Sequence, residues 1–592
     1  MVKLLRYLKP YRAAALAAPL LMVLEVVMDL LQPSLMASIV NDGVMKGDLG
    51  HIGLMSIWMI LAAVCGLLGG MGCAYYAIRA SVGFGTDLRN ALFRKVQAFA
   101  FRELDKFSGG TLVTRLTNDV MQVQMLVQIF LRMLIRSSML FFGSIAMAFL
   151  ISPKLSLVFA VSLPLFFIFL YALLSKSIPL YRTLQAKLDR VNSVLLENLN
   201  GIRVVKAFVR AAFEKVRFKR ANEENYEVGL KAARLLAINN PIMTLLLNAS
   251  IVCILWIGGA QTWEGGLAIG SLAAFITYVT QTLNAMVSLG NTLMNISRAK
   301  ASSDRIIEVL DTPSSMAEPV AAPLAAGTPS APSAPSALSA LYGQVEFRHV
   351  FFGYEEGGEE PVLKDVSFLA KPGETIGILG STGAGKSSLV NLMPRLYDPT
   401  EGSVLVNGVD VKSIPLEELR SQVGIVLQQA VLFGGTIRDN IRYGKPDASQ
   451  DEIEAAARAA EAHDFIQSFP EGYDTQIGQR GVTLSGGQKQ RISIARALLA
   501  QPGILILDDS TSAVDLRTEA RIRTALRDRL QGSTCFIIAQ RISSVADADR
   551  ILVIEDGRIV AQGNHAELMV SSEVYRDIYE SQLGLEEASH AT

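Results

Sequence analysis

The chain has few cysteines. Only four occur in 592 residues, none of them in a CxxC pair or a cluster with histidine; they are Cys65, Cys73, Cys253 and Cys535. A disulfide framework or a structural zinc site would need closely spaced cysteines, so neither is indicated. We expect these thiols to serve in packing.

A net charge of either sign is also lacking. Lysine and arginine together number 55, as do aspartate and glutamate, so the formal net charge is zero. This balance argues against a broad nucleic-acid-binding surface, and we expect no nucleic acid partner. The N-terminal stretch MVKLLRYLKPYR has no small-residue cleavage site, so a removable signal peptide is not expected either.

Apolar residues, by contrast, are abundant. Half of the chain is hydrophobic and the mean hydropathy is +0.33, which is high for a soluble protein. Six apolar stretches are long enough, at about 20 residues each, to cross the hydrocarbon core of a bilayer. They are residues 13–39, 52–78, 133–151, 155–174, 242–261 and 267–289.

The segments between these spans differ in charge. Short loops hold few cations, whereas residues 79–136 and 176–234 are long and rich in arginine and lysine. The positive-inside rule places these long segments and both termini in the cytoplasm. Leucine and valine recur in them at helical spacing, so we expect the membrane helices to extend outward. The sequence thus predicts a protein that crosses the cell membrane several times. In a bacterium this would be the inner, or plasma, membrane.

Composition divides the chain into four parts. We predict a transmembrane domain in residues 1–310, a linker rich in proline, alanine and serine in 311–343, an α/β domain in 344–583 and a frayed tail in 584–592. The α/β assignment rests on short β-rich runs that alternate with helical segments and glycine-rich turns. The predicted fold is therefore an all-α six-helix membrane domain followed by an α/β domain.

A glycine-rich loop follows the strand-like residues 375–379. Its glycines let backbone N–H groups surround phosphates at a helix N-terminus, Lys386 neutralises β and γ charge, and Ser387 can bind Mg²⁺. A chance glycine turn is the weaker interpretation, because strand, loop, Lys-Ser pair and helix come in the required order. ATP and Mg²⁺ are the expected ligands. The predicted site residues are Gly380, Ser381, Thr382, Gly383, Ala384, Gly385, Lys386, Ser387 and Ser388.

Two further motifs accompany this P-loop. The apolar run 504–507 ends in Asp508, where a P-loop enzyme holds Mg²⁺, usually through water. A second anion-binding surface is predicted where a helical pattern begins with Ser485, Gly486, Gly487 and Gln488. Taken alone, this segment is equally well explained as an ordinary N-capped helix. One chain cannot easily direct both surfaces at the same phosphate.

Together these motifs resemble the ABC transporter family, and the order of the two domains resembles its exporter half-transporters. The resemblance covers nearly the whole chain and implies an ATPase-coupled transporter. It also implies that two nucleotide domains pair head to tail, so that the P-loop of one and the LSGGQ segment, residues 484–488, of the other enclose each ATP. The partner would be a second half-transporter in the bilayer.

The resemblance also implies roles for single residues. Tyr354 would stack on adenine, Gln428 would sense Mg²⁺ and water, and residues 512–515 would link the two sites. Residues 109–119 and 201–208 occupy the places of the two coupling helices. A plain surface aromatic remains the alternative for Tyr354, and a solvated helix face remains the alternative for the two helical segments.

The sequence departs from the family pattern at the catalytic positions. Asp509 stands where a glutamate normally orients the attacking water, and the shorter side chain has less reach for a proton transfer over about 2.6 to 3.2 Å. Gln540 stands where the family has a histidine near the γ-phosphate, and a neutral amide cannot titrate. Gln479 replaces a frequent glutamate and Leu427 a frequent proline. We predict an impaired site on this chain and an intact signature for the partner's site.

That asymmetry resembles heterodimeric ABC exporters, in which one composite site hydrolyses ATP and the other mainly holds it. The first hypothesis is therefore an ATP-driven heterodimeric exporter of a small amphiphile, drug-like as in multidrug efflux or a lipid. A homodimeric exporter with slow hydrolysis is a second hypothesis. A third is an ATP-gated membrane regulator that does not pump.

Two carboxylates lie inside the first predicted span. Glu25 and Asp29 are four residues apart, hence on one helix face, and carboxylates in a membrane are costly unless they face a cavity or a partner. They are candidate substrate or gating residues. An ion pair with Arg132 or Arg136, or a position near the outer interface, explains them equally well.

Overall fold

The computed structural model of the chain describes residues 2–313, 316, 343–354, 360–478, 481, 484–510, 514–529 and 532–590. Contacts divide the chain into two units, Met1–Gln97 with Gly109–Thr312 and Ala98–Ser108 with Pro313–Thr592. Most of the predicted linker, residues 311–343, lies outside the described residues.

The first unit is helical, and the six predicted spans are confirmed. Each overlaps one of six helices in the described part of the chain that are long and apolar enough to cross a membrane. Their bounds are Lys3–Val44, Leu49–Gln97, Gly109–Ile151, Pro153–Asn200, Ala211–Trp263 and Ile269–Gly290. Several exceed the roughly 20 residues that a bilayer requires, so the predicted outward extensions are helical.

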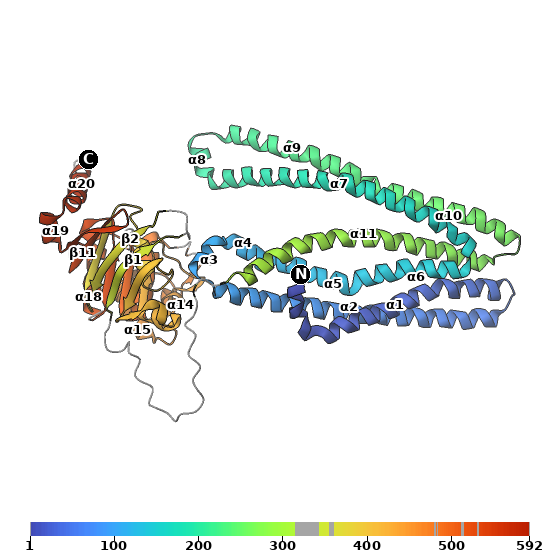
Figure 1. Ribbon diagram of the computed structural model, residues 1–592, viewed down its shortest axis with the longest axis horizontal. Coiled ribbons are helices and arrows are strands. Elements are labelled where there is room, and N and C mark those ends of the chain that lie inside the picture. The colour runs from blue at the N-terminus through green and yellow to red at the C-terminus, as the bar shows by residue number, and fades with distance from the viewer. Residues whose placement is uncertain are drawn as a thin grey trace, which may run out of the picture. The chain divides into compact units, whose positions relative to one another are not determined.

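Local changes of helix type subdivide these long helices in the first unit. The elements are η1 (Val2–Tyr11), α1 (Arg12–Ser38), η2 (Ile39–Val44), α2 (Leu49–Gln97), α4 (Gly109–Thr114), η3 (Arg115–Asp119), α5 (Val120–Ile129), η4 (Phe130–Leu134), α6 (Ile135–Ile151), α7 (Pro153–Asn200), α8 (Ile202–Ala207), α9 (Ala211–Ala237), α10 (Asn239–Trp263) and α11 (Ile269–Asp311). Figure 1 shows α7 and α9 side by side, with α8 at the turn between them.

Small residues bring α1 and α2 close together. A Cβ atom added at Gly69 would lie 3.0 Å from the carbonyl oxygen of Leu21, and one added at Gly70 would lie 2.9 Å from Oε2 of Glu25. Glycine therefore lets the two backbones approach, as small residues do in membrane helix pairs. This approach presses Glu25 against the backbone of α2.

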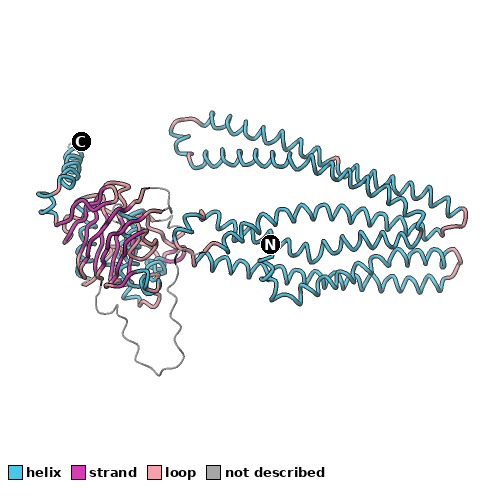
Figure 2. Tube along the Cα trace, viewed as in Figure 1, coloured by secondary structure: helices cyan, strands magenta, loops and turns pink. Residues whose placement is uncertain are grey.

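The second unit contains the strands, drawn in magenta in Figure 2. Its main sheet has the order β12-β11-β3-β10-β9-β6 and is parallel except at β12. A smaller antiparallel sheet has the order β2-β1-β4-β5, and β7 pairs with β8. The strands are β1 (Val345–Phe352), β2 (Leu363–Ala370), β3 (Thr375–Gly380), β4 (Glu401–Val406), β5 (Val409–Asp410), β6 (Val423–Val426), β7 (Gly435–Thr436), β8 (Gln476–Ile477), β9 (Ile504–Asp508), β10 (Thr534–Ile538), β11 (Arg550–Glu555) and β12 (Arg558–Gly563).

The central strands are apolar because both faces of the parallel sheet are covered. All five residues of β9 are buried, which fits the continuous apolar run of its sequence. The helical elements of the unit are α3 (Phe101–Lys106), α12 (Lys386–Asn391), η6 (Val411–Ser413), α13 (Leu416–Gln422), α14 (Ile437–Arg442), α15 (Gln450–Ala459), α16 (His463–Gln467), η7 (Gly472–Asp474), α17 (Gly486–Leu499), α18 (Leu516–Arg529), η9 (Ile542–Ser544), α19 (His565–Ser571) and α20 (Glu573–His590). The fold class expected from the sequence is therefore confirmed.

Two details differ from the predicted segments. Helix α20 continues to His590, where a frayed tail was expected from residue 584, because LEEASH has no glycine or proline to end a helix. Residues 98–108 group with the second unit, although they precede most of the membrane helices in the sequence. Phe101 contacts the ring of Tyr397 at 6.0 Å between centroids, and the Tyr397 hydroxyl donates to Asp105 Oδ2 at 2.7 Å.

Residues 109–119, whose role as a coupling helix remains a prediction, pack within the helical unit. Arg305 of α11 donates from Nε to Asp119 Oδ2 at 2.8 Å and from Nη2 to the other carboxylate oxygen. Arg115 forms an ion pair with Glu308 at 2.9 Å. Helix α8 (Ile202–Ala207) has no buried side chain, and the role of residues 201–208 as a coupling helix remains a prediction.

Candidate nucleotide-binding site

The P-loop lies where β3 ends and α12 begins. Gly383 and Gly385 have φ values of +88° and +97°, which L side chains rarely adopt. A Cβ atom at Gly385 would also lie 2.8 Å from Leu363 Cδ2. Because this loop follows the carboxyl end of a central parallel strand, it stands where open α/β sheets bind ligands.

Lys386 lies beneath the loop. Its side chain is buried, and Nζ donates to the carbonyl oxygens of Gly380 at 2.8 Å and Ser381 at 2.7 Å. Burial lowers the pKa of Lys386, and the negative charges of Asp508 and Asp509 partly oppose that shift. A cation held this way is suited to anionic phosphate groups.

Ser387, in the first turn of α12, meets Asp508 at the end of β9. Ser387 Oγ donates to Asp508 Oδ1 at 3.2 Å, and burial raises the pKa of Asp508. A hydroxyl and a carboxylate fit Mg²⁺, which prefers oxygen ligands and takes few of them from the protein. Within the described residues there is no group of three or more His, Cys, Asp or Glu side chains able to hold a metal.

Two of the predicted residues meet at a third, Asp509. Gln428 Nε2 and Gln540 Nε2 both donate to Asp509 Oδ2, each at 3.2 Å. The Asp509 backbone has φ +45°, and its N–H donates to the carbonyl of Ile538 at 3.0 Å. Burial raises the pKa of Asp509, whereas the hydrogen bond from Gln428 and the charge of Lys386 lower it. The structure therefore brings the predicted base, sensor glutamine and histidine-replacing glutamine to one carboxylate oxygen.

Tyr354 lies beside the P-loop helix. Its hydroxyl is 2.8 Å from Ser388 Oγ, and its ring meets those of Phe352 and Tyr397 edge-on at 4.9 and 5.3 Å. The residue is 44% exposed, so ring surface remains for a base to stack on.

The signature segment begins α17 with a capping box. Ser485 Oγ accepts from the N–H of Gln488 at 3.3 Å, and Gln488 Oε1 accepts from the N–H of Ser485 at 2.9 Å. Ser485 and Gly486 are exposed. Within the described part of the chain no hydrogen bond joins residues 485–488 to residues 380–388.

No motif in the sequence predicted one of the contacts at this site. Gln582 of α20 donates to the carbonyl of Gln540 at 2.8 Å and accepts from the N–H of Ile542 at 2.9 Å. It thereby holds the backbone that carries Gln540. Gln479 and residues 512–513 lie outside the described residues, so their predicted roles are not addressed.

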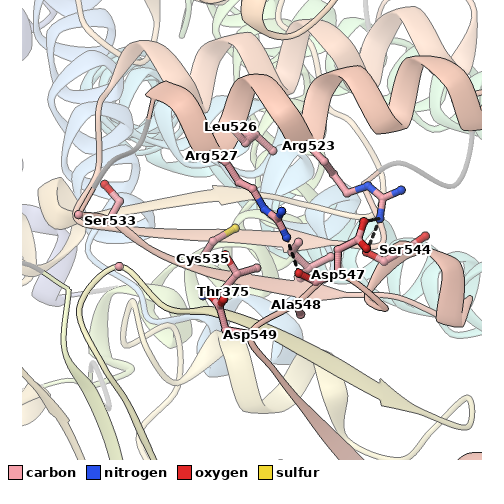
Figure 3. Close-up of a pocket in the computed structure, with 13 residues that line it drawn as sticks. Thr375, Arg523, Leu526, Arg527, Ser533, Cys535, Ser544, Asp547, Ala548 and Asp549 are labelled. Atoms are coloured by element: carbon pink, nitrogen blue, oxygen red, sulfur yellow. Dashed lines mark hydrogen bonds and ion pairs between the residues drawn. The ribbon is translucent and has the colours of Figure 1, made fainter. Parts of the chain in front are cut away.

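A cavity of about 350 Å³ elsewhere in the unit is not part of this site. Figure 3 shows it beneath α18, near the amino ends of β3 and β10. Arg523 donates to the carbonyl of Ser543 at 2.9 Å, and Asp549 accepts from the N–H of Thr375 at 2.7 Å. Its Cys535 is buried, which raises the pKa of that thiol to about 12. The polar groups around this cavity hold the fold together.

The membrane carboxylates form ion pairs. Arg136 contacts Glu25 Oε1 at 3.4 Å and Asp29 Oδ2 at 3.1 Å. Among the explanations that the sequence left open for Glu25 and Asp29, the structure shows the ion pair with Arg136.

Comparison with known proteins agrees with this geometry. Residues 16–286 match the family described as ABC transporter transmembrane region, and residues 363–512 match the family described as ABC transporter. An uncharacterized ABC transporter ATP-binding protein of Bacillus subtilis, YfiB, is 43% identical over 586 residues, which cover 99% of both chains. A fatty acid ABC transporter ATP-binding/permease protein of Mycobacterium tuberculosis is 38% identical over 488 residues, 82% of this chain and 75% of that protein.

A solved structure shows the same arrangement. The structure of a bacterial Atm1-family ABC exporter with ATP bound matches with a TM-score of 0.77 and 27% identity, and the match covers 96% of this chain and 98% of that one. The chain therefore belongs to the ABC transporter family, as an ATPase-coupled exporter half-transporter that crosses the membrane several times and carries a cytoplasmic nucleotide-binding domain.

Proposed function

We propose that this chain is one half of a heterodimeric ABC exporter and that the two ATP sites of the pair do different work. The site on this chain's own P-loop holds ATP and hydrolyses it slowly. The signature at Ser485 and Gly486 completes the working site on the partner's P-loop. The transported substrate is a small amphiphile.

The observation that carries the proposal is the arrangement around Asp509. A carboxylate oxygen offers two lone pairs in its plane, and Oδ2 already accepts from Gln428 and Gln540. At that oxygen, water would therefore have to compete with two amide donors. An aspartate also reaches less far than a glutamate, and a general base must come within hydrogen-bond distance of the proton it removes.

Gln540 adds to the impairment. An amide can donate a hydrogen bond toward a γ-phosphate, but it cannot gain or lose a proton at neutral pH as a histidine can. Its side chain here points to Asp509, and Gln582 fixes its backbone. Asp509 and Gln540, the two residues that depart from the family pattern, are thus in direct contact.

The parts that bind nucleotide are complete on this chain. Lys386 and the loop N–H groups suit the β and γ phosphates, Tyr354 offers a ring for adenine, and Ser387 and Asp508 would hold Mg²⁺. When bound, Mg²⁺ neutralises developing charge on the phosphates. Retention of ATP without turnover follows from complete binding groups beside an impaired base.

The exposed start of α17 supports the second half of the proposal. Ser485 and Gly486 lie at a capped helix N-terminus, where free N–H groups and the helix dipole favour an anion. The segment makes no hydrogen bond to the described P-loop residues of its own chain. In a head-to-tail pair, the phosphate available to it belongs to the partner.

An amphiphilic substrate is supported by one relative and by the membrane unit. The mycobacterial relative is named a fatty acid transporter, and the helical unit contains cavities with both charged and apolar walls. ATP-driven export is the function these features support best.

The experiment that tests the proposal is a comparison of ATP binding and ATP turnover in the purified full-length chain. We expect stoichiometric ATP binding with turnover far below the 1 to 1000 per second typical of enzymes, roughly under 0.1 per second. Turnover in the typical range by the chain alone would refute the impaired site and favour an active homodimer.

A further inference from the structure

The membrane unit contains a cavity whose charged lining is entirely cationic. It measures about 650 Å³ and lies among α5, η4, α6 and α11. Arg132 and Arg136 are its charged lining residues, and no carboxylate lines it. Charged side chains that are partly withdrawn from water are costly unless they face a partner, a cavity or a ligand.

The charge of Arg136 is already neutralised. Its guanidinium pairs with Glu25 and Asp29 of α1, neither of which lines the larger cavity. Glu25 cannot easily turn elsewhere, because its Oε2 is packed against Gly70, where even a Cβ atom would lie 2.9 Å away. The α1 carboxylates are therefore committed to Arg136.

Arg132 has no such partner. It is half-buried, and among the residues that the structure describes it makes neither an ion pair nor a side-chain hydrogen bond. It lines this cavity and also a second one, of about 450 Å³, which Glu25 and Asp29 line as well. Glu25, whose Oε2 is buried without a hydrogen-bond partner, lines that second cavity and not the larger one. Of the two arginines that line the larger cavity, Arg132 is therefore the one whose charge remains available to a ligand.

The rest of the larger cavity is divided between polar and apolar groups. Asn284 and Ser288 of α11 and Gln128 of α5 can orient a polar head. Met125, Ile129, Met133 and Leu140 give it an apolar wall. An unpaired guanidinium with amides beside it binds a carboxylate or phosphate, and the apolar wall suits a hydrocarbon chain.

We propose that this cavity binds the anionic head of an amphiphile, with Arg132 as the group that recognises the charge. This inference rests on the proposed export function, because the bound amphiphile would be the transported substrate. The recognised chemistry is an acidic head, carboxylate or phosphate, on an alkyl chain.

The test measures equilibrium binding to the full-length chain in nanodiscs of phosphatidylcholine, with the signal of empty nanodiscs subtracted. Four probes share a sixteen-carbon chain and differ in the head: palmitate, hexadecyl phosphate, hexadecanol and hexadecyltrimethylammonium. We expect at least one acidic probe to bind about tenfold or more tightly than hexadecanol, since charge-assisted hydrogen bonds add that much. The two acidic probes distinguish a carboxylate ligand from a phosphate ligand.

Variants locate the binding. Arg132→Gln should weaken the acidic probes to the level of hexadecanol and leave hexadecanol itself unchanged, whereas Arg132→Lys should retain most of the difference. Arg79→Gln is the matched control, because Arg79 is an exposed arginine of α2 that lines neither cavity. Retained hexadecanol binding shows that a variant is folded.

Three results would overturn the proposal. The acidic probes could bind no more tightly than hexadecanol, Arg132→Gln could bind them as the unmodified chain does, or the cationic probe could bind most tightly, which would make Glu25 and Asp29 the recognition groups. The assay needs neither partner nor hydrolysis, so failure of the heterodimer hypothesis leaves it unchanged. Tight binding without ATP-driven transport would instead refute the export function alone.

Discussion

Gln540 Nε2 lies 3.2 Å from Asp509 Oδ2, and the same oxygen accepts a second hydrogen bond of 3.2 Å from Gln428. Two neutral amides thus occupy the carboxylate oxygen at the place where the family normally uses glutamate and histidine to direct water. The hydrogen bond between Gln540 and Asp509 thus connects the two residues at which the sequence departs from the family pattern. Because the two side chains interact, the effect of a substitution at one should depend on the residue at the other.

Asp509→Glu alone should restore little hydrolysis at this chain's own P-loop. The longer side chain gains reach, but Gln540 still donates to it and still cannot titrate. We expect a change of less than about tenfold, and a larger gain only for Asp509→Glu combined with Gln540→His, because residues that act as a unit are not additive. Single-turnover ATP hydrolysis by the full-length variants checks this. Equal rates for single and double variants would contradict the shared role.

Lys386→Ala should weaken nucleotide binding at this chain's site. The variant removes the buried ammonium that suits β and γ phosphate charge, so we expect ATP affinity to fall by about tenfold or more. In the assembled pair, hydrolysis at the partner's P-loop should continue. Bound nucleotide and phosphate release, measured on the same preparation, separate the two effects. Loss of all hydrolysis with unchanged nucleotide occupancy would exclude this division of labour.

Asp508→Asn should stabilise the nucleotide-free chain while abolishing Mg²⁺-dependent ATP binding. Burial raises the pKa of Asp508 above its ordinary 3.8, even with Lys386 nearby, so the folded chain binds this proton more tightly than the unfolded chain. The group therefore favours folding below pH 3.8, and that contribution is lost as the pH rises through the raised value. Calorimetry at neutral pH should show a higher unfolding midpoint for the variant. A lower midpoint would show that the carboxylate supports the fold.

Asp119→Ala should destabilise the helical unit strongly. Asp119 is fully buried and binds Arg305 through two hydrogen bonds, so truncation leaves the arginine without its carboxylate and costs about 2 to 4 kcal/mol. Asp42→Ala is the control, since the side chains of Asp42 and Lys46 are solvent-exposed and their screened ion pair should contribute little to stability. Tryptophan fluorescence during denaturation in detergent reports on this unit. Similar losses for both variants would refute the buried role.

The membrane spans and the P-loop were predictable because each has a local signature. Twenty apolar residues can satisfy their backbone in lipid only as a helix, and the loop at Lys386 has a fixed order of residues around a phosphate. The sequence also identified Asp509 and Gln540 as departures from the family pattern. The spacing of these residues in the sequence could not show that Gln540 and Gln428 donate to the same oxygen of Asp509.

The features that the sequence did not predict arise from contacts between residues that are far apart in the chain. Gln582 lies in the last helix and has no motif around it, yet it fixes the backbone of Gln540. Residues 98–108 resemble any amphipathic stretch, so only the fold shows that they pack with the second unit. Charge spacing left Arg132 and Arg136 as equal partners for Glu25, and the geometry selects Arg136.

The central claim is that the working site uses the partner's P-loop and this chain's signature. The most direct measurement is steady-state ATPase activity of the assembled pair carrying either Gly486→Val or Asp509→Glu in this chain. Gly486 is exposed at the start of α17, so a bulkier side chain should spare the fold but block close backbone approach to a phosphate. We predict that Gly486→Val lowers activity about 100-fold, as loss of preorganised donors does, and that Asp509→Glu changes it less than about threefold. Full activity with Gly486→Val and a many-fold increase with Asp509→Glu would contradict the assignment.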